Sequence, residues 1–200
     1  MKLNELEIKI QIGSDELFQQ VFKSCEKLCG APASHVLQLD EYYYTEDRQL
    51  KKQDLVIRIR TNGDQKTIAL KSPRIDLPSG MTKRIELEFL SANGKEVIDQ
   101  LQTQGLHCFE SAEKERWTFL YQDFEIVLDR LPFIGSFIEI EGPSEAKIGD
   151  LVNLLEISTY PIIQKNYGEL MTEKFRELNL SLSSIHATFS QETSVCAQCQ

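Results

Sequence analysis

The sequence predicts an antiparallel α+β protein with about eight strands and several peripheral helices, in which the strands either form a solvated sheet or close into a β-barrel (a tunnel). Segments with strand-like alternation outnumber helical segments, and they lack the regular strand–helix–strand order of a parallel sheet. Nearly every expected strand carries a charged row backed by an apolar row, because side chains on a strand alternate between faces. The charged rows mix acids with bases, which suits a wet barrel interior whose apolar exterior is covered by helices.

The N-terminal half is expected to begin with a strand and a helix. Ser14 can cap that helix, because its hydroxyl can accept a hydrogen bond from a backbone N–H of the first turn. The Asn62-Gly63 pair indicates a hairpin between two later strands. Lys51 falls in a connecting loop and is expected to lie outside any site. The expected elements are a strand at 3–12, a helix at about 14–29, and strands at 35–45, 54–60 and 66–72.

The C-terminal half continues with strands and ends in helices. Asn93 to Glu96 resembles a capping box, in which both side chains satisfy the first backbone N–H groups of a helix. From 179 onward the sequence is polar and is predicted to be disordered. We therefore expect a tunnel domain at 1–178 and a C-terminal tail at 179–200. The expected elements are strands at 82–90, 107–121, 123–130 and 136–141, and helices at 93–104, from 144 onward and at 167–178.

Composition restricts the class of protein. The net charge of −9 argues against general nucleic-acid binding, which needs a basic surface. No apolar run approaches the roughly 18 residues that a membrane span requires. The five cysteines are irregularly spaced and no secretory signal precedes them, so a reduced, cytoplasmic protein is expected. Cys196 and Cys199 form a lone C-x-x-C pair in the tail, which is weak support for a metal or redox role.

The charged rows have two interpretations. An antiparallel sheet with one solvated face also alternates apolar and charged residues, so the pattern alone leaves a solvated sheet and a tunnel open. In the tunnel interpretation, acids two positions apart on a strand would approach one divalent cation, and the basic residues would bind phosphate oxygens. A site for metal ions together with a polyanion is the chemistry that such a mixed interior favours.

Glu5-Leu6-Glu7-Ile8-Lys9 resembles the E-x-E-x-K signature of the CYTH superfamily, also called the triphosphate tunnel metalloenzymes. The resemblance spans about residues 3–178 and implies an eight-stranded barrel that binds a triphosphate and divalent metal ions. The further segments that resemble family motifs, in family order, are 40–45, 58–60, 70–73, 84–88, 114–116, Asp129, 135–142 and 166–170.

The resemblance also implies roles for individual residues. Lys9 and Tyr42 resemble a Lys–Tyr pair tied to catalysis in some phosphatase members, and Glu86 and Glu88 fit either metal binding or the orientation of neighbouring arginines. Mg²⁺ or Mn²⁺ is the implied cofactor. The implied metal ligands are Glu5, Glu7, Asp129, Glu139 and Glu141. The implied phosphate-binding residues are Arg58, Arg60, Lys71, Arg84, Lys114 and Arg116.

Among the activities of this superfamily, the one that needs the fewest additional sequence features is metal-dependent hydrolysis of inorganic tripolyphosphate or a related triphosphate. The His-Phe pair that precedes E-x-E-x-K in well-known class IV adenylyl cyclases is missing, and Val56 stands where thiamine triphosphatases are expected to carry a Trp. A cyclase that converts ATP to cyclic AMP and pyrophosphate is the alternative, and a non-catalytic polyphosphate- or nucleotide-binding module is the second. The expected partner is a small anionic triphosphate, with no nucleic acid and no membrane; a homodimer is left open.

Overall fold

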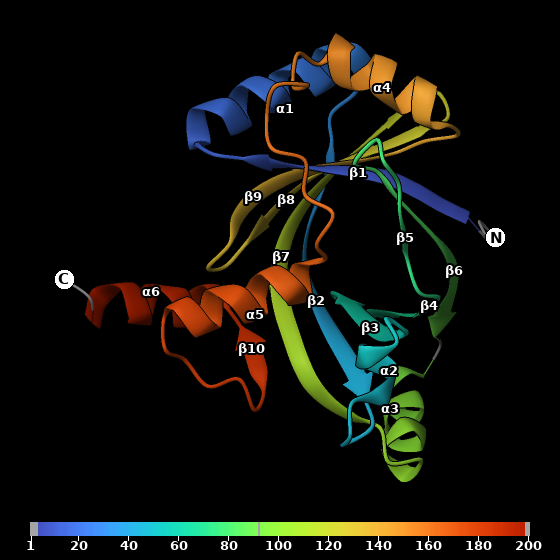
Figure 1. Ribbon diagram of the computed structural model, residues 1–200, viewed down its shortest axis with the longest axis vertical. Coiled ribbons are helices and arrows are strands. Elements are labelled where there is room, and N and C mark those ends of the chain that lie inside the picture. The colour runs from blue at the N-terminus through green and yellow to red at the C-terminus, as the bar shows by residue number, and fades with distance from the viewer. Residues whose placement is uncertain (1–3, 92, 199–200) are drawn as a thin grey trace.

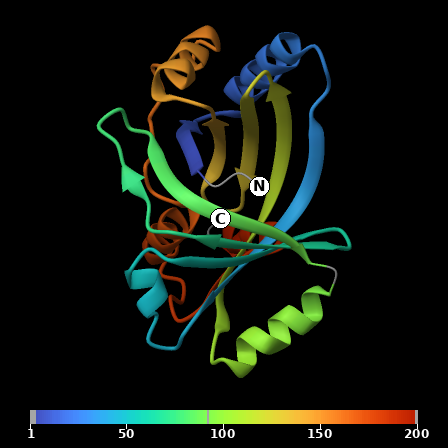
Figure 2. The same ribbon diagram turned by 90° about the vertical axis from the view of Figure 1, so that its right-hand side faces the viewer.

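A closed antiparallel barrel forms the centre of the protein in the computed structural model, which describes residues 4–91 and 93–198 (Figure 1). The strands follow the order β1-β9-β8-β7-β2-β3-β4-β6 around the barrel, and pairing of β1 with β6 closes the ring (Figure 2). The predicted fold class is therefore confirmed. The barrel strands are β1 (Asn4–Ile12), β2 (Ser34–Tyr44), β3 (Val56–Asn62), β4 (Gln65–Lys71), β6 (Thr82–Ser91), β7 (His107–Tyr121), β8 (Phe124–Leu131) and β9 (Gly135–Glu141).

Strand β1 shows how the alternating sequence builds the barrel wall. Ile8 is buried in an apolar core outside the barrel, whereas its neighbours Glu7 and Lys9 line the interior. The register places Glu7 opposite Glu141 and Lys9 opposite Glu139 on β9. The charged rows of adjacent strands therefore face one another inside the barrel, and this arrangement resolves the choice between a tunnel and a solvated sheet in favour of the tunnel.

Two helices cover the outer face of the wall formed by β1, β9, β8 and β7. Helix α1 (Asp15–Cys29) begins at Ser14, whose hydroxyl accepts the Leu17 N–H as predicted. Helix α4 (Glu145–Leu154) lies on the same side of the barrel (Figure 1). Phe18 of α1 and Ile148 of α4 join one buried cluster with the outward-facing isoleucines of β1, β8 and β9. Trp117 packs against this cluster, and its ring meets that of Phe18 edge-on with the centroids 5.2 Å apart.

Several short elements were not predicted from the sequence. Helix α2 (Gln49–Lys52) lies between β2 and β3, and strand β5 (Ile75–Asp76) lies in the connection between β4 and β6. Helix α3 (Gly94–Thr103) was predicted, and Asn93 caps it by accepting the Glu96 N–H.

Within the described residues, no helix has the length and apolar character needed to cross a membrane.

The structure corrects the prediction of a disordered tail. Strand β10 (Ile185–Ala187) pairs in parallel with β7, and α6 (Phe189–Gln198) follows it. Ile185 is 3% exposed and packs against α5 (Tyr167–Glu177). Strand β7 extends beyond its pairing with β8, so its free edge supplies the hydrogen-bond partners that a three-residue strand needs. Cys199, and with it the predicted C-x-x-C pair, lies outside the described residues.

Candidate functional site

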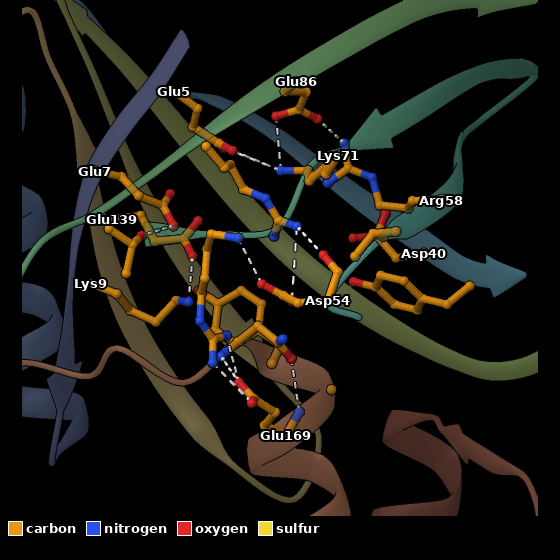
Figure 3. Close-up of a pocket in the computed structure, with 18 of the residues that line it drawn as sticks. Glu5, Glu7, Lys9, Asp40, Asp54, Arg58, Lys71, Glu86, Glu139 and Glu169 are labelled. Carbon is orange, nitrogen blue, oxygen red and sulfur yellow. Dashed lines mark hydrogen bonds and ion pairs between the residues drawn. The ribbon is translucent and has the colours of Figure 1, made fainter. Parts of the chain in front are cut away.

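The barrel encloses a charged cavity of about 800 Å³ (Figure 3). Of the predicted site residues, all except Asp129 line it. Among the described lining residues, twelve are acidic and ten are basic, so the acids are in excess by two. A triphosphate would meet a negative balance there unless cations accompany it. The basic residues are Lys9, Lys51, Lys52, Arg58, Arg60, Lys71, Arg74, Arg84, Lys114 and Arg116, and the acids are Glu5, Glu7, Asp40, Asp54, Asp76, Glu86, Glu88, Glu110, Glu125, Glu139, Glu141 and Glu169.

Glu7 and Glu139 lie at the centre of the acidic wall formed by β1 and β9. Burial, reinforced by the charge of Glu139, raises the pKa of Glu7 to about 7. Burial would also raise the pKa of Glu139, but Lys9 at 3.3 Å and Arg116 at 2.8 Å hold that pKa well below its usual range. Glu7 accepts a long hydrogen bond of 3.4 Å from the Thr82 hydroxyl. Glu7 is therefore a half-buried carboxylate whose charge is poorly compensated.

The acidic wall fits a hard divalent cation. Glu5, Glu7, Glu139 and Glu141 project into the cavity from two paired strands, and carboxylate oxygens are the ligands that Mg²⁺ and Mn²⁺ prefer. Across residues 4–91 and 93–198, no three acidic, histidine or cysteine side chains already stand at ligand spacing. A cation bound there would offset both effects that raise the pKa of Glu7, its burial and the charge of Glu139.

Asp129 differs from the prediction that made it a metal ligand. Its side chain is fully buried and lies behind the cavity wall. Its carboxylate accepts two hydrogen bonds from Arg116 and one of 3.0 Å from the Tyr167 hydroxyl. The Lys114 ammonium lies 3.6 Å away. Asp129 therefore orients cations that face the cavity. The strand pattern could not reveal this, because Asp129 shares the inward face of β8 but meets α5 there.

Carboxylates orient the basic residues on β3 and β4. Arg58 donates to Glu86 at 3.2 Å and to Glu88 at 3.1 Å. Lys71 lies 3.1 Å from Glu5 and 2.8 Å from Glu86. The sequence left two roles open for Glu86 and Glu88, metal binding or the orientation of neighbouring arginines. Their hydrogen bonds from Arg58 fit the second role. Because each of these cations has an acidic partner nearby, an incoming phosphate would exchange places with a carboxylate.

A second group of ion pairs joins β2, β3 and β7. Arg60 donates two hydrogen bonds to Asp40, at 2.7 and 2.8 Å. Although burial opposes it, the charges of Arg60 and Lys114 hold the pKa of Asp40 well below its usual range. Burial, with the neighbouring charges of Arg116 and Arg60, lowers the pKa of Lys114 to about 7. Asp40 was quoted in a motif but was not assigned a role from sequence.

Arg84 is held mainly by uncharged groups. Its guanidinium donates to the Ser72 carbonyl at 3.0 Å and to the Asp54 carbonyl at 3.1 Å. The Asp54 carboxylate lies farther away, at 3.9 Å. Backbone carbonyls fix the direction of a guanidinium without neutralising it, so Arg84 presents most of its charge to the cavity.

Three cations of the cavity were missed because they lie outside the charged strand rows. Lys51 and Lys52 belong to α2, and Arg74 lies just before β5. Lys51 forms an ion pair with the buried Glu110, so the expectation that Lys51 lies outside the site is wrong. Arg74 donates two hydrogen bonds to Glu169 of α5, at 2.6 and 2.9 Å.

Lys9 contacts a different tyrosine from the one predicted. Its ammonium lies 4.4 Å from the centre of the Tyr167 ring. Tyr42 also lines the cavity, but from β2, four strands away from β1 around the barrel. Tyr167 lies in the 166–170 segment that resembles a family motif, and this position was the available signal for its participation.

The sequence matches the CYTH domain model over residues 3–159, and the chain therefore belongs to the CYTH domain family. PH1819 from Pyrococcus horikoshii is 24% identical, with a TM-score of 0.67 over 85% of this chain and 99% of that one. PH1012 from the same organism is 22% identical, with a TM-score of 0.68 over 83% and 98%. HpAC1 from Hippeastrum, for which a dominant triphosphatase activity is described, is 17% identical, with a TM-score of 0.67 over 86% and 95%. At these identities the structural similarity shows the fold. No curated protein matches the sequence.

Proposed function

We propose that this protein is a metal-dependent triphosphatase that hydrolyses inorganic tripolyphosphate or a related triphosphate inside the barrel. One observation carries the proposal: a single cavity joins an acidic wall suited to divalent cations with the basic side chains of β3, β4, β6 and β7. The excess of two acids among its described lining residues favours an anionic substrate that arrives with metal ions. The triphosphatase activity described for HpAC1 is consistent with this reading.

The basic residues would bind the substrate and compensate its charge. Glu5, Glu7, Glu139 and Glu141 would hold the cation, which supplies charge neutralisation and a more acidic bound water. Arg84 would contact phosphate oxygens directly, because it faces the cavity with a charge that backbone carbonyls do not cancel. Arg58 and Lys71 would release their carboxylates and bind nonbridging oxygens, so that they stabilise the charge of in-line transfer.

Lys9 would act on the bond that breaks. Water adds to the terminal phosphorus while the bridging oxygen leaves with its electron pair on pyrophosphate, and phosphate is the second product. The Lys9 ammonium, fixed by Glu139 at 3.3 Å, can donate a hydrogen bond to an oxygen on which charge accumulates.

A class IV adenylyl cyclase is a second candidate because the cavity, at about 800 Å³, is larger than a triphosphate alone requires. Leu55, Val56 and Tyr44 line it beside the charged residues and would offer apolar contact to a nucleoside. In that reaction the ribose 3′-hydroxyl attacks the α-phosphorus and pyrophosphate leaves.

A product assay distinguishes these functions. The purified protein is incubated with tripolyphosphate, ATP, GTP or thiamine triphosphate, in Mg²⁺, Mn²⁺ or EDTA, and phosphate and cyclic AMP are both measured. We expect phosphate release from tripolyphosphate that EDTA abolishes and that Glu139→Gln eliminates, whereas Lys95→Ala on the exposed face of α3 has no effect. Cyclic AMP formed faster than phosphate would identify the cyclase. Tight tripolyphosphate binding without turnover, unchanged by EDTA, would identify a binding module.

A further inference from the structure

The segment that precedes α5 runs alongside the C-terminal part of β1. The Gln11 N–H donates to the Pro161 carbonyl at 3.0 Å, and the Ile163 N–H donates to the Lys9 carbonyl at 2.8 Å. Ile10 and Ile162 form an antiparallel bridge between these hydrogen bonds. The backbone of Lys9 is therefore fixed by residues that lie beyond the 3–159 match to the family model.

The side chain of Lys9 is enclosed by the same segment. Its ammonium donates to the Lys165 carbonyl at 3.3 Å, lies 3.3 Å from Glu139, and sits over the Tyr167 ring at 4.4 Å. The residue is 7% exposed. An ammonium has three N–H donors, and within the described residues these contacts use two of them. One donor therefore remains for a phosphate oxygen.

Contacts on three sides fix the Tyr167 ring. Its hydroxyl donates to the buried Asp129 at 3.0 Å, and its ring centroid lies 5.2 Å from that of Phe137. Asn166 and Glu169 form a capping box that fixes the start of α5. The ring also lies 5.6 Å from the Lys114 ammonium. These contacts hold the tyrosine ring in the cavity wall beside the ammonium groups of Lys9 and Lys114.

We infer that Tyr167 is a positioning residue that holds the Lys9 ammonium in the cavity, so that the tyrosine beside Lys9 is Tyr167 and not the Tyr42 that the family resemblance paired with it in catalysis. An aromatic face attracts a cation through its quadrupole and occupies none of the hydrogen-bond donors that a carboxylate would engage. The ring therefore limits the movement of the ammonium while leaving it charged and able to donate to substrate. The consequence for catalysis rests on the proposed triphosphatase function, whereas the contact itself does not.

A nuclear magnetic resonance measurement tests the contact without requiring activity. In protein labelled with ¹³Cε-lysine, protons above an aromatic face resonate upfield, so the Lys9 signal should lie upfield of the other lysines. Its disappearance in Lys9→Met assigns it. We expect the displacement to persist in Tyr167→Phe, which keeps the ring, and in Tyr42→Phe, and to vanish in Tyr167→Leu. A Lys9 signal without displacement in the wild-type protein would overturn the inference even if Tyr167→Leu failed to fold.

Steady-state kinetics tests the consequence. Tyr167→Leu should lower kcat for tripolyphosphate about tenfold with a smaller change in KM, and Tyr167→Phe should recover most of the loss. Tyr160→Phe, outside the cavity, is the matched tyrosine control. Equal losses in the Phe and Leu variants would assign the effect to the hydroxyl and overturn a role for the ring. A displaced Lys9 signal in a wild-type protein that hydrolyses no triphosphate would support the contact and reject the proposed function.

Discussion

Glu7 and Glu139 are diagonal neighbours on β1 and β9, and their surroundings give them opposite acidities. Burial and the charge of Glu139 raise the pKa of Glu7 to about 7, whereas Lys9 and Arg116 hold the pKa of Glu139 low against the effect of burial. The same substitution, Glu to Gln, should therefore affect the stability of the metal-free protein in opposite directions at these two positions.

Glu7→Gln should stabilise the metal-free protein above pH 7. The folded-state pKa of Glu7 lies above its ordinary value of 4.5, so its contribution to folding is present below pH 4.5 and is lost as pH rises to about 7. Glutamine does not ionise, so the variant avoids this loss of unfolding free energy, which is on the order of 1–3 kcal/mol. Urea unfolding in EDTA at pH 5 and pH 8 measures the difference, with the exposed Glu16→Gln as control. An equal difference at both pH values would contradict the prediction.

Glu139→Gln should destabilise the metal-free protein at pH 8. Its carboxylate compensates two buried cations, and its removal leaves Lys9 and Arg116 with less compensation. A loss of about 3–5 kcal/mol is expected for a buried ion pair that loses one partner. The same urea experiment applies. Because the folded-state pKa of Glu139 is lowered, its contribution should decline as pH falls below its unfolded-state pKa.

Tripolyphosphate should stabilise the folded protein in the presence of Mg²⁺. A ligand concentration about 100 times the dissociation constant raises the free energy of unfolding by about 2.7 kcal/mol. For a protein of this size that corresponds to a melting shift on the order of 5–10 °C. Arg58→Ala should reduce the shift, whereas Lys95→Ala, whose side chain is 83% exposed, should not. A shift reproduced by NaCl at the same ionic strength would count against binding in the cavity.

Tripolyphosphate binding should take up a proton at pH 8 through Lys114. The pKa of Lys114 is about 7 in the free protein, so the side chain is mostly neutral at pH 8. A bound polyanion favours the ammonium form and raises that pKa, so a proton is taken from the buffer. Calorimetry in buffers of different ionisation enthalpy measures the uptake. Lys114→Arg, which stays charged, should abolish it; the same uptake in that variant would assign the proton to another group.

Ile185→Asp should destabilise the protein by about 3 kcal/mol or more, because it places an unpaired carboxylate in an apolar cluster. Ile185 is 3% exposed and lies in the cluster that includes Met171 and Phe175. Ser184→Asp adds the same charge at an exposed neighbouring position and should have little effect. Equal stabilities of the two variants, measured by thermal unfolding, would show that β10 does not pack as described.

The barrel was predictable because its strands are long and two-faced. Glu7 and Lys9 flank Ile8, and this alternation alone assigns the faces of β1. The pairing of Glu7 with Glu141 was not predictable, because alternation identifies a strand's faces but does not determine its neighbours. The family resemblance supplied the closed barrel and most of the cavity residues.

Site residues outside the strand rows escaped prediction for physical reasons. Lys51 lies on a helix of four residues, too short for helical periodicity. Arg74 lies in an irregular connection. Asp129 has the residue type and the face of a metal ligand, but contacts from Arg116 and Tyr167 give it another position. These contacts join elements that are distant in sequence, and local pattern contains no information about them.

Strand β1 pairs on one edge with β6 and on the other with β9, which begins at Gly135. During biosynthesis, the edge of β1 that pairs with β9 therefore stays unpaired until the ribosome has translated β9. The segment that surrounds Lys9 is translated later still. Non-local pairing of this kind slows folding and prolongs the exposure of apolar strand edges. Ribosome-bound chains that end before residue 135 should therefore depend more on chaperones than the released protein does.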